Sequence, residues 1–293
     1  MLLGTMRKII FGCLLLCLNS CSSDKGYEPL KVPITTESVA HGRELFNGVA
    51  ACAFCHGDKP LPNALPSGGR IQHDLYGDVA AANLTPSKSG IGDWQAKDFI
   101  SAIRDGLRPD GAKLSPEVHR GMEWMADTDL LAMVAYLTTL PAVENRVERR
   151  ELGFVSRNTT GFFQGRHDVG GYVPKVDPKH ELPYGKYLVD NVARCSYCHS
   201  SPASVLSSEG YLQGGHTMQF EGGEKLIPSI TNSSAHGIGN WTESEIVTYL
   251  KSGDTPDHRR ISAEFCPVGF YKMAAERELL AIAKYLKSDL SSK

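Results

Sequence analysis

The pentapeptide Cys-x-x-Cys-His occurs twice in this chain of 293 residues, over 52–56 and over 195–199. Two thiols at this spacing can reach the two vinyl groups on one edge of a porphyrin and form thioether bonds. The histidine that follows then lies under the ring with an imidazole nitrogen facing the iron. The motif is therefore typical of covalently bound haem c. Two copies predict two haems, held by Cys52, Cys55 and His56 and by Cys195, Cys198 and His199.

Two other kinds of site use a Cys-x-x-Cys pair. A structural zinc site needs four nitrogen or sulfur ligands, and a thioredoxin-like redox pair needs a βαβ context that this sequence does not suggest. The repetition of the whole pentapeptide in similar surroundings favours haem over both.

A helix is predicted ahead of each motif, over 38–46 and over 184–189. In both helices a glycine lies ten residues before the first haem cysteine, Gly42 in one and Gly185 in the other. Glycine at this place suits a helix that passes close to another helix.

The two halves continue to correspond after the motifs. Gly-Gly pairs at 68–69 and 214–215 would let the backbone approach the haem edge. Further helices are predicted after two Gly-Ile-Gly-x-Trp segments and at the end of each half, over 95–105, 242–252, 127–140 and 276–290. At the start of the helix over 242–252, Thr242 with Glu245 fits a capping box. Because no segment alternates with a period of two for long, little sheet is expected.

Both halves resemble class I cytochrome c domains. The resemblance rests on Cys-x-x-Cys-His after a helix, on Gly-Ile-Gly-x-Trp, and on a last helix ending Ala-Tyr-Leu (135–137) or Lys-Tyr-Leu (284–286). It implies an all-α fold of two tandem domains, over 38–141 and 183–290, joined by a connector over 142–182. Tandem dihaem cytochromes that serve as electron-transfer subunits of periplasmic dehydrogenases are similar to this arrangement.

The sequence departs from the family at the sixth iron ligand. The family usually has a methionine in a stretch like L-x-P-x-M-P, and neither 114–122 nor 261–267 has one at that place. Aligned without gaps from Gly90 and Gly237, His119 falls opposite Cys266 and Trp124 falls opposite Tyr271.

This alignment predicts different distal ligands for the two haems. For the first haem the candidate is His119, with Met122 as the alternative and Met125 behind them. For the second haem Cys266 is placed ahead of Met273 and Met218. A thiolate would push electron density onto the iron and give the second haem a low potential.

The N-terminus reads as an export signal. Arg7-Lys8 precedes an apolar run over 9–18, too short to span a bilayer, which takes about 20 residues. The run leads into Leu18-Asn19-Ser20-Cys21, which resembles a bacterial lipoprotein signal. We therefore expect a signal peptide over 1–20, lipid at Cys21, a tether over 21–37 and a periplasmic, membrane-anchored protein, with plain signal-peptide cleavage as the alternative.

The leading functional hypothesis is electron transfer. A formal net charge of −2 gives no reason to expect nucleic acid as a partner, and no general base or nucleophile stands out. We expect a dihaem carrier of single electrons between a periplasmic dehydrogenase and a terminal acceptor, either a cytochrome or an oxidase. The alternatives are a dihaem oxidoreductase acting on a sulfur compound or peroxide at a His/Cys-ligated haem, and a haem sensor or structural module.

Overall fold

The computed structural model describes residues 34–115, 117–155, 169–201, 210–220, 222–262 and 265–289. The predicted signal peptide and the predicted lipid site at Cys21 lie outside these residues. Within the described ranges, no helix has both the length and the apolar character needed to cross a membrane.

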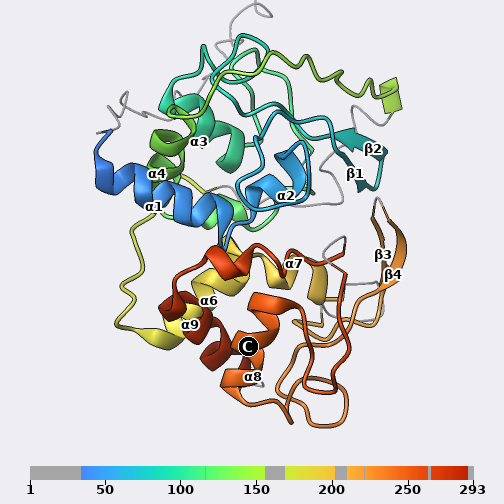
Figure 1. Cartoon of the computed structure of the whole chain (residues 1–293). Helices are drawn as coiled ribbons and strands as arrows, with labels where there is room; N and C mark the ends of the chain where they lie inside the picture. The colour runs from blue at the N-terminus through green and yellow to red at the C-terminus, as the bar shows by residue number, and fades with distance from the viewer. Residues whose placement is uncertain are drawn as a thin grey trace, which may run out of the picture.

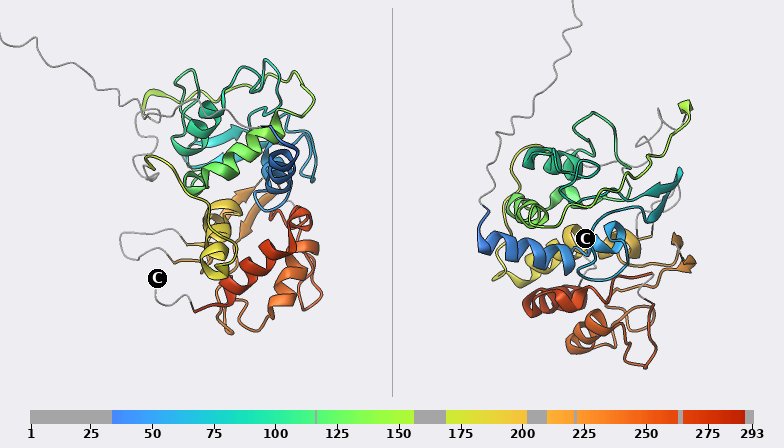
Figure 2. Two further views of the ribbon diagram at one scale, coloured as in Figure 1. Left: turned by 90° about the vertical axis from the view of Figure 1, so that its left-hand side faces the viewer. Right: turned by 45° about the horizontal axis from the view of Figure 1, so that its top comes forward.

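The described elements follow the same order twice. The first series is α1 (Thr36–Asn47), α2 (Cys52–His56), β1 (Ile71–Asp74), β2 (Gly77–Ala80), α3 (Ala96–Arg104), the 3₁₀ helix η1 (Met122–Trp124) and α4 (Asp127–Leu137). The second series is α6 (Glu181–Tyr187), the π-helix η2 (Leu188–Val192), α7 (Cys195–His199), β3 (Thr217–Phe220), β4 (Gly223–Leu226), α8 (Glu243–Ser252), the 3₁₀ helix η3 (Tyr271–Met273) and α9 (Glu276–Lys287). Figures 1 and 2 show the two series as two halves packed against each other.

The predicted helical fold is confirmed, with two small hairpins in addition. β1 pairs with β2 and β3 with β4, each in an antiparallel register of four residue pairs. The hairpins lie at the same edge of the molecule (Figures 1 and 2). Their strands are too short for an alternating pattern to stand out in the sequence, so the expectation of an all-α fold missed them.

Glycines set the helix crossings in both halves. A Cβ on Gly42 of α1 would lie 1.8 Å from the carbonyl oxygen of Ala132 in α4. A Cβ on Gly185 of α6 would lie 2.2 Å from the carbonyl oxygen of Ala281 in α9. The prediction that these glycines permit a close helix–helix approach is therefore confirmed.

Capping residues fix two helix starts. Thr242 and Glu245 form the capping box predicted at the start of α8, with the Glu245 N–H donating to Thr242 Oγ1 at 3.2 Å. Thr35 caps α1 in the same way, accepting from the Ser38 N–H at 3.1 Å. Helix α1 thus begins within the predicted tether.

One hydrophobic core runs through both halves. Buried side chains of α1, α3 and α4 join those of α6, α8 and α9 in a single cluster. At the seam the buried Tyr187 hydroxyl accepts from the Ala126 N–H at 3.0 Å and donates to Asp129 Oδ2 at 2.7 Å. The halves therefore share core and hydrogen bonds.

The described part of the connector packs on the first half. Asn83 Nδ2 donates to the Val143 carbonyl at 2.8 Å, and Arg150 forms a two-pronged ion pair with the buried carboxylate of Asp74. This part of the connector is therefore packed and is not a free linker.

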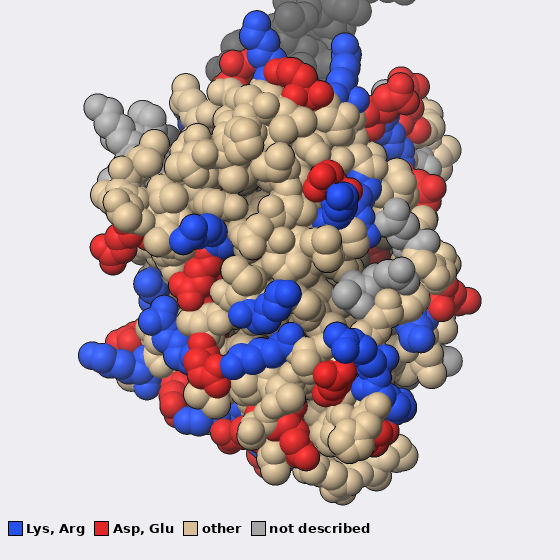
Figure 3. Space-filling view, viewed as in Figure 1, with Lys and Arg blue, Asp and Glu red and all other residues tan. Residues whose placement is uncertain are grey.

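Charges of both signs are interspersed over the second half in the view of Figure 1, while the first half shows a broad uncharged area (Figure 3). This face therefore carries no large field of a single sign, which a polyanionic partner would need.

Candidate functional site

The two motifs adopt the same local structure. Each lies in one short helical turn, α2 or α7, that follows a left-handed residue, Ala51 with φ 45° or Arg194 with φ 56°. Left-handed backbone is uncommon for residues other than glycine. Its occurrence before both motifs shows that the chain enters the two helical turns through the same sharp bend. In a helix, residues three and four apart share a face. The two thiols and the imidazole of each motif are therefore gathered on one side.

A backbone carbonyl orients each motif histidine. His56 Nδ1 lies 2.8 Å from the Ala82 oxygen, and His199 Nδ1 lies 2.8 Å from the Pro228 oxygen. A carbonyl only accepts, so Nδ1 carries the proton and Nε2 keeps its lone pair for a metal. Removal from water lowers the pKa of both imidazoles, which favours this neutral form.

Glycines bring those carbonyls close. A Cβ on Gly68 would lie 2.6 Å from the carbonyl carbon of Ala82, and one on Gly214 would lie 2.5 Å from the Pro228 oxygen. Both glycines thus pack against the chain's own backbone, and their approach to a haem edge stays a prediction. The packing against the backbone is what sets the acceptors beside His56 and His199.

His119 lies opposite His56. Their rings are parallel within 2°, and their centroids are 6.1 Å apart. An imidazole nitrogen lies about 2 Å from a metal that it binds, so two nitrogens on opposite sides of one metal would be about 4 Å apart. Each ring centroid lies about one ångström behind its nitrogen, so the two centroids would be about 6 Å apart. The pair therefore has the spacing of two histidines on opposite faces of one iron.

The methionines near His119 are built into the core. Met122 is 5 % exposed and Met125 is fully buried, and both belong to the hydrophobic cluster. Both methionines therefore pack in the core, and Met122 stays the alternative ligand.

Cys266 lies among the second-motif cysteines. Burial raises the pKa of its thiol to about 12, and the neighbouring Cys198 thiol adds to the rise. The hydroxyl of Tyr249 in α8 forms a hydrogen bond with the Cys266 sulfur. Of the competing methionines, Met273 is 40 % exposed and Met218 lies half-buried on β3.

The ungapped alignment of the halves fails after the bridge that follows α3 or α8. Nine positions separate Lys113 from Met122 and eleven separate Arg260 from Tyr271, so the second half has two extra residues. Tyr271 therefore corresponds to Met122, both buried, and not to Trp124 as expected. His119 and Cys266 are each placed by their own contacts, not by this alignment.

The described cysteine thiols are free. None of the five described cysteines forms a disulfide, and the described residues contain no group of three His, Cys, Asp or Glu side chains placed to hold a metal ion.

Several positioning groups have no signal in the sequence. Ala82 and Pro228 act through their carbonyls, and Tyr249 lies inside an ordinary amphipathic helix, so only the packed structure identifies them.

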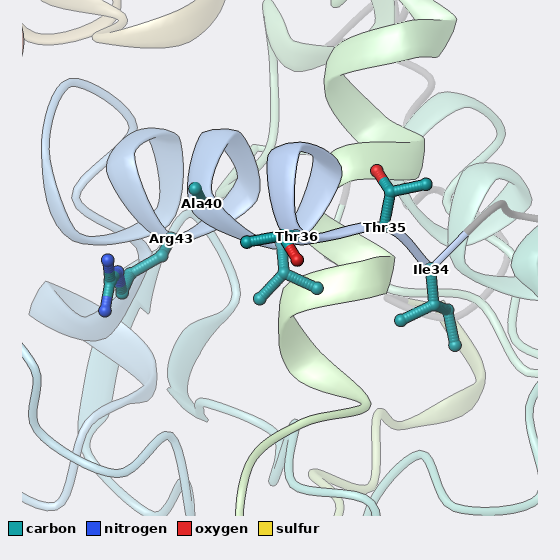
Figure 4. Close-up of a pocket in the computed structure, with 6 residues that line it drawn as sticks. Ile34, Thr35, Thr36, Ala40 and Arg43 are labelled. Carbon is teal, nitrogen blue, oxygen red and sulfur yellow. The ribbon is translucent and has the colours of Figure 1, made fainter.

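A hollow beside α1 contains no motif residue (Figure 4); it is lined by Ile34, Thr35, Thr36, Val39, Ala40 and Arg43.

Comparisons with known proteins point to one kind of protein. Residues 39–141 match the family model described as cytochrome c. The chain is 29 % identical over 273 residues to the fructose dehydrogenase cytochrome subunit of Gluconobacter japonicus, which covers 89 % of this chain and 54 % of that protein. It is 30 % identical over 251 residues to the alcohol dehydrogenase (quinone) cytochrome c subunit of Gluconobacter oxydans, covering 81 % and 52 %.

One relative of similar length is named as a dihaem protein. The diheme cytochrome c-type of Cereibacter sphaeroides is 27 % identical over 266 residues, which are 86 % of each chain. By contrast, the chain spans only about half the length of the two dehydrogenase subunits.

Proposed function

We propose that this chain, which is a c-type cytochrome, carries single electrons as a dihaem electron-transfer subunit. The observation that carries the proposal is the repeated motif geometry, in which each histidine donates from Nδ1 to a backbone carbonyl and presents Nε2. Haem c supplies the redox chemistry when bound, because its iron takes up and releases one electron at a time.

Two haems would be held by the two motifs. Cys52 and Cys55 would form the thioether bonds of the first site and Cys195 and Cys198 those of the second, with His56 and His199 as axial ligands. The parallel, well-spaced rings of His56 and His119 support His119 as the sixth ligand of the first iron. The hydrogen bond between Tyr249 and Cys266, and the electrostatic influence between Cys266 and the thiols of Cys195 and Cys198, support Cys266 for the second iron.

The repeated order of elements supports two tandem class I cytochrome c domains, over 38–141 and 183–290, with a connector over 142–182. The first of these coincides with the matched family model, and the second rests on the repeat alone.

We propose a dehydrogenase as electron donor, because several relatives are named as cytochrome subunits of fructose, alcohol or gluconate dehydrogenases. The acceptor would be a cytochrome or an oxidase. We also propose export to the periplasm and a lipid anchor at Cys21, on the strength of the N-terminal sequence. The alternative of an oxidoreductase acting on a sulfur compound or peroxide gains no support from the names of these relatives.

The test is haem counting followed by spectroscopy of the exported full-length protein. We expect two haems per chain by the pyridine haemochrome method, and one haem after Cys52→Ala/Cys55→Ala or after Cys195→Ala/Cys198→Ala. The ferric EPR spectrum should contain two low-spin signals that added cyanide leaves unchanged, because both irons are capped. One haem in the wild type would refute the dihaem carrier, and a high-spin signal that cyanide converts would favour the oxidoreductase.

A further inference from the structure

We propose that Arg194 and Asn191, in the second half of the chain, are positioning residues for His119 in the first half. The inference rests on the proposed role of His119 as an iron ligand. It means that the ligation of the first iron depends on how the two halves are docked.

Two hydrogen bonds across the seam hold the segment that carries His119. Arg194 Nε donates to the carbonyl oxygen of Arg120 at 2.9 Å, and Asn191 Nδ2 donates to the carbonyl oxygen of Gly121 at 2.9 Å. Both acceptors directly follow His119 in the chain. The donors come from η2 and from the residue that leads into α7, so the second motif and the first ligand segment are tied together.

The same segment presses against the η2 backbone. Gly121 has φ 98°, and a Cβ there would lie 2.7 Å from the Asp190 carbonyl oxygen. Only glycine allows both this backbone conformation and this approach. A π-helix such as η2 is rare and is frequently found at functional sites, which fits a role in holding the segment.

Arg194 is itself held in place at the junction of the two motifs. Its guanidinium lies 4.4 Å from the ring centroid of Tyr197, inside the second motif, a distance at which cation–π attraction fixes the fork. Burial raises the pKa of the Cys55 and Cys198 thiols, and the Arg194 charge is the next influence on both and lowers it. One guanidinium therefore lies near the thiols of both motifs.

The segment with His119 needs such support because it is a series of turns. His56 lies in a helix, whereas His119 lies in the turns that lead from the Leu107–Lys113 bridge into η1. The first half offers the second half no equivalent arginine, since the residue that matches Arg194 at the start of the first motif is the short Ala51. The first motif instead contacts the second half through an apolar pair. Phe54 lies edge-on to Phe270, with 6.0 Å between the ring centroids, and Phe270 lies four residues after Cys266.

The experiment compares variants of the full-length, haem-loaded protein by ferric EPR and by cyanide binding. Arg194→Gln should raise the fraction of the first iron open to cyanide by about tenfold, because a tenfold change corresponds to the loss of one hydrogen bond from a charged donor. Cyanide binding at the second iron should not change. Arg194→Lys, which keeps a positively charged donor, should restore most of the closed form. Gly121→Ala should reproduce the opening by a different route.

Arg259→Gln is the matched control, because the Arg259 side chain is 71 % exposed and pairs with Asp257, two residues earlier in the same loop. It should behave as the wild type. Equal cyanide binding in Arg194→Gln and wild type, at two haems per chain and unchanged circular dichroism, would overturn the positioning role. If His119→Ala itself leaves the first iron closed, the ligand assignment is wrong and this inference falls with it; if His119→Ala opens the iron and Arg194→Gln does not, only the positioning role is wrong.

Discussion

The chemistry of each motif histidine is decided by one hydrogen bond. Because Ala82 and Pro228 accept from Nδ1 of His56 and His199, each ring keeps Nε2 as its only free lone pair. The other tautomer, with the proton on Nε2, would present an N–H group to the metal. The backbone thus determines the tautomer that a haem iron needs.

At the first site we expect His119→Ala to convert one low-spin ferric EPR signal into a high-spin signal, because the iron loses its sixth ligand. Met122→Leu should leave the spectrum unchanged, since the substitution keeps the volume of a buried side chain and costs less than about 1.5 kcal/mol of stability. The reverse pair of results would assign Met122 as the ligand.

At the second site we expect Cys266→Met to raise one midpoint potential by on the order of 0.1 V, a fraction of the range of about 0.8 V that axial ligands span. A thioether donates less electron density than a thiolate. Tyr249→Phe should shift the same potential slightly downward, because it removes a hydrogen bond to the sulfur. Spectroelectrochemical titration measures both, and unchanged potentials in Cys266→Met would exclude thiolate ligation.

At the scale of elements, the two halves depend on the same crossing of two helices. We expect Gly42→Ala and Gly185→Ala each to cost about 3 kcal/mol or more, because the added methyl would lie 1.8 or 2.2 Å from a carbonyl oxygen. Gly153→Ala, with no atom within 4 Å of its Cβ, is the control and should be near neutral. Urea unfolding at constant m-value measures the differences, and equal midpoints for all three would contradict the packing.

The start of α9 carries a pH-sensitive carboxyl group. Glu278 is fully buried, accepts from the Ala275 N–H at 3.0 Å and lies 3.4 Å from the Tyr184 hydroxyl. Burial, and next the Glu44 charge, raise its pKa to about 7 from the ordinary value of 4.5, against the influence of the Ala275 N–H and the charges of Arg277 and His41.

This shift fixes the sign of a stability change with pH. Between about 4.5 and 7 the folded chain holds the proton that the unfolded chain has lost, so stability falls as the pH rises through this window, by about 2 to 3 kcal/mol. Glu278→Gln, which is never charged, should flatten the fall. Urea midpoints at pH 5, 6, 7 and 8 measure it, and parallel profiles for variant and wild type would show that Glu278 does not titrate in this window.

At the scale of the whole molecule, the shared core predicts cooperative unfolding. Tyr187 links the halves through Ala126 and Asp129 inside one hydrophobic cluster. We expect the thermal transitions followed by far-ultraviolet circular dichroism and by Soret absorbance to coincide. Tyr187→Phe should lower the midpoint, since it leaves buried groups without partners, whereas Tyr172→Phe at an exposed site should not. Two separate transitions would indicate independent halves.

Local patterns in the sequence determined the features that depend on near neighbours in the chain. The repeated pentapeptide, the capping box of Thr242 and Glu245, and the glycines at 42 and 185 all predict structure over one helix or turn, and the fold agrees with them. The helical class follows from the same signals, because each helix carries its own start, face and end.

Only the tertiary structure decided what depends on distant segments. The four-residue hairpins are too short to identify from alternation, and two extra residues before η3 misled the alignment of Trp124 with Tyr271. The opposition of His119 to His56 and the contact of Cys266 with Tyr249 join residues far apart in the chain. Sequence spacing cannot give such pairs, because they arise from how the helices pack and not from the local conformation of any one segment.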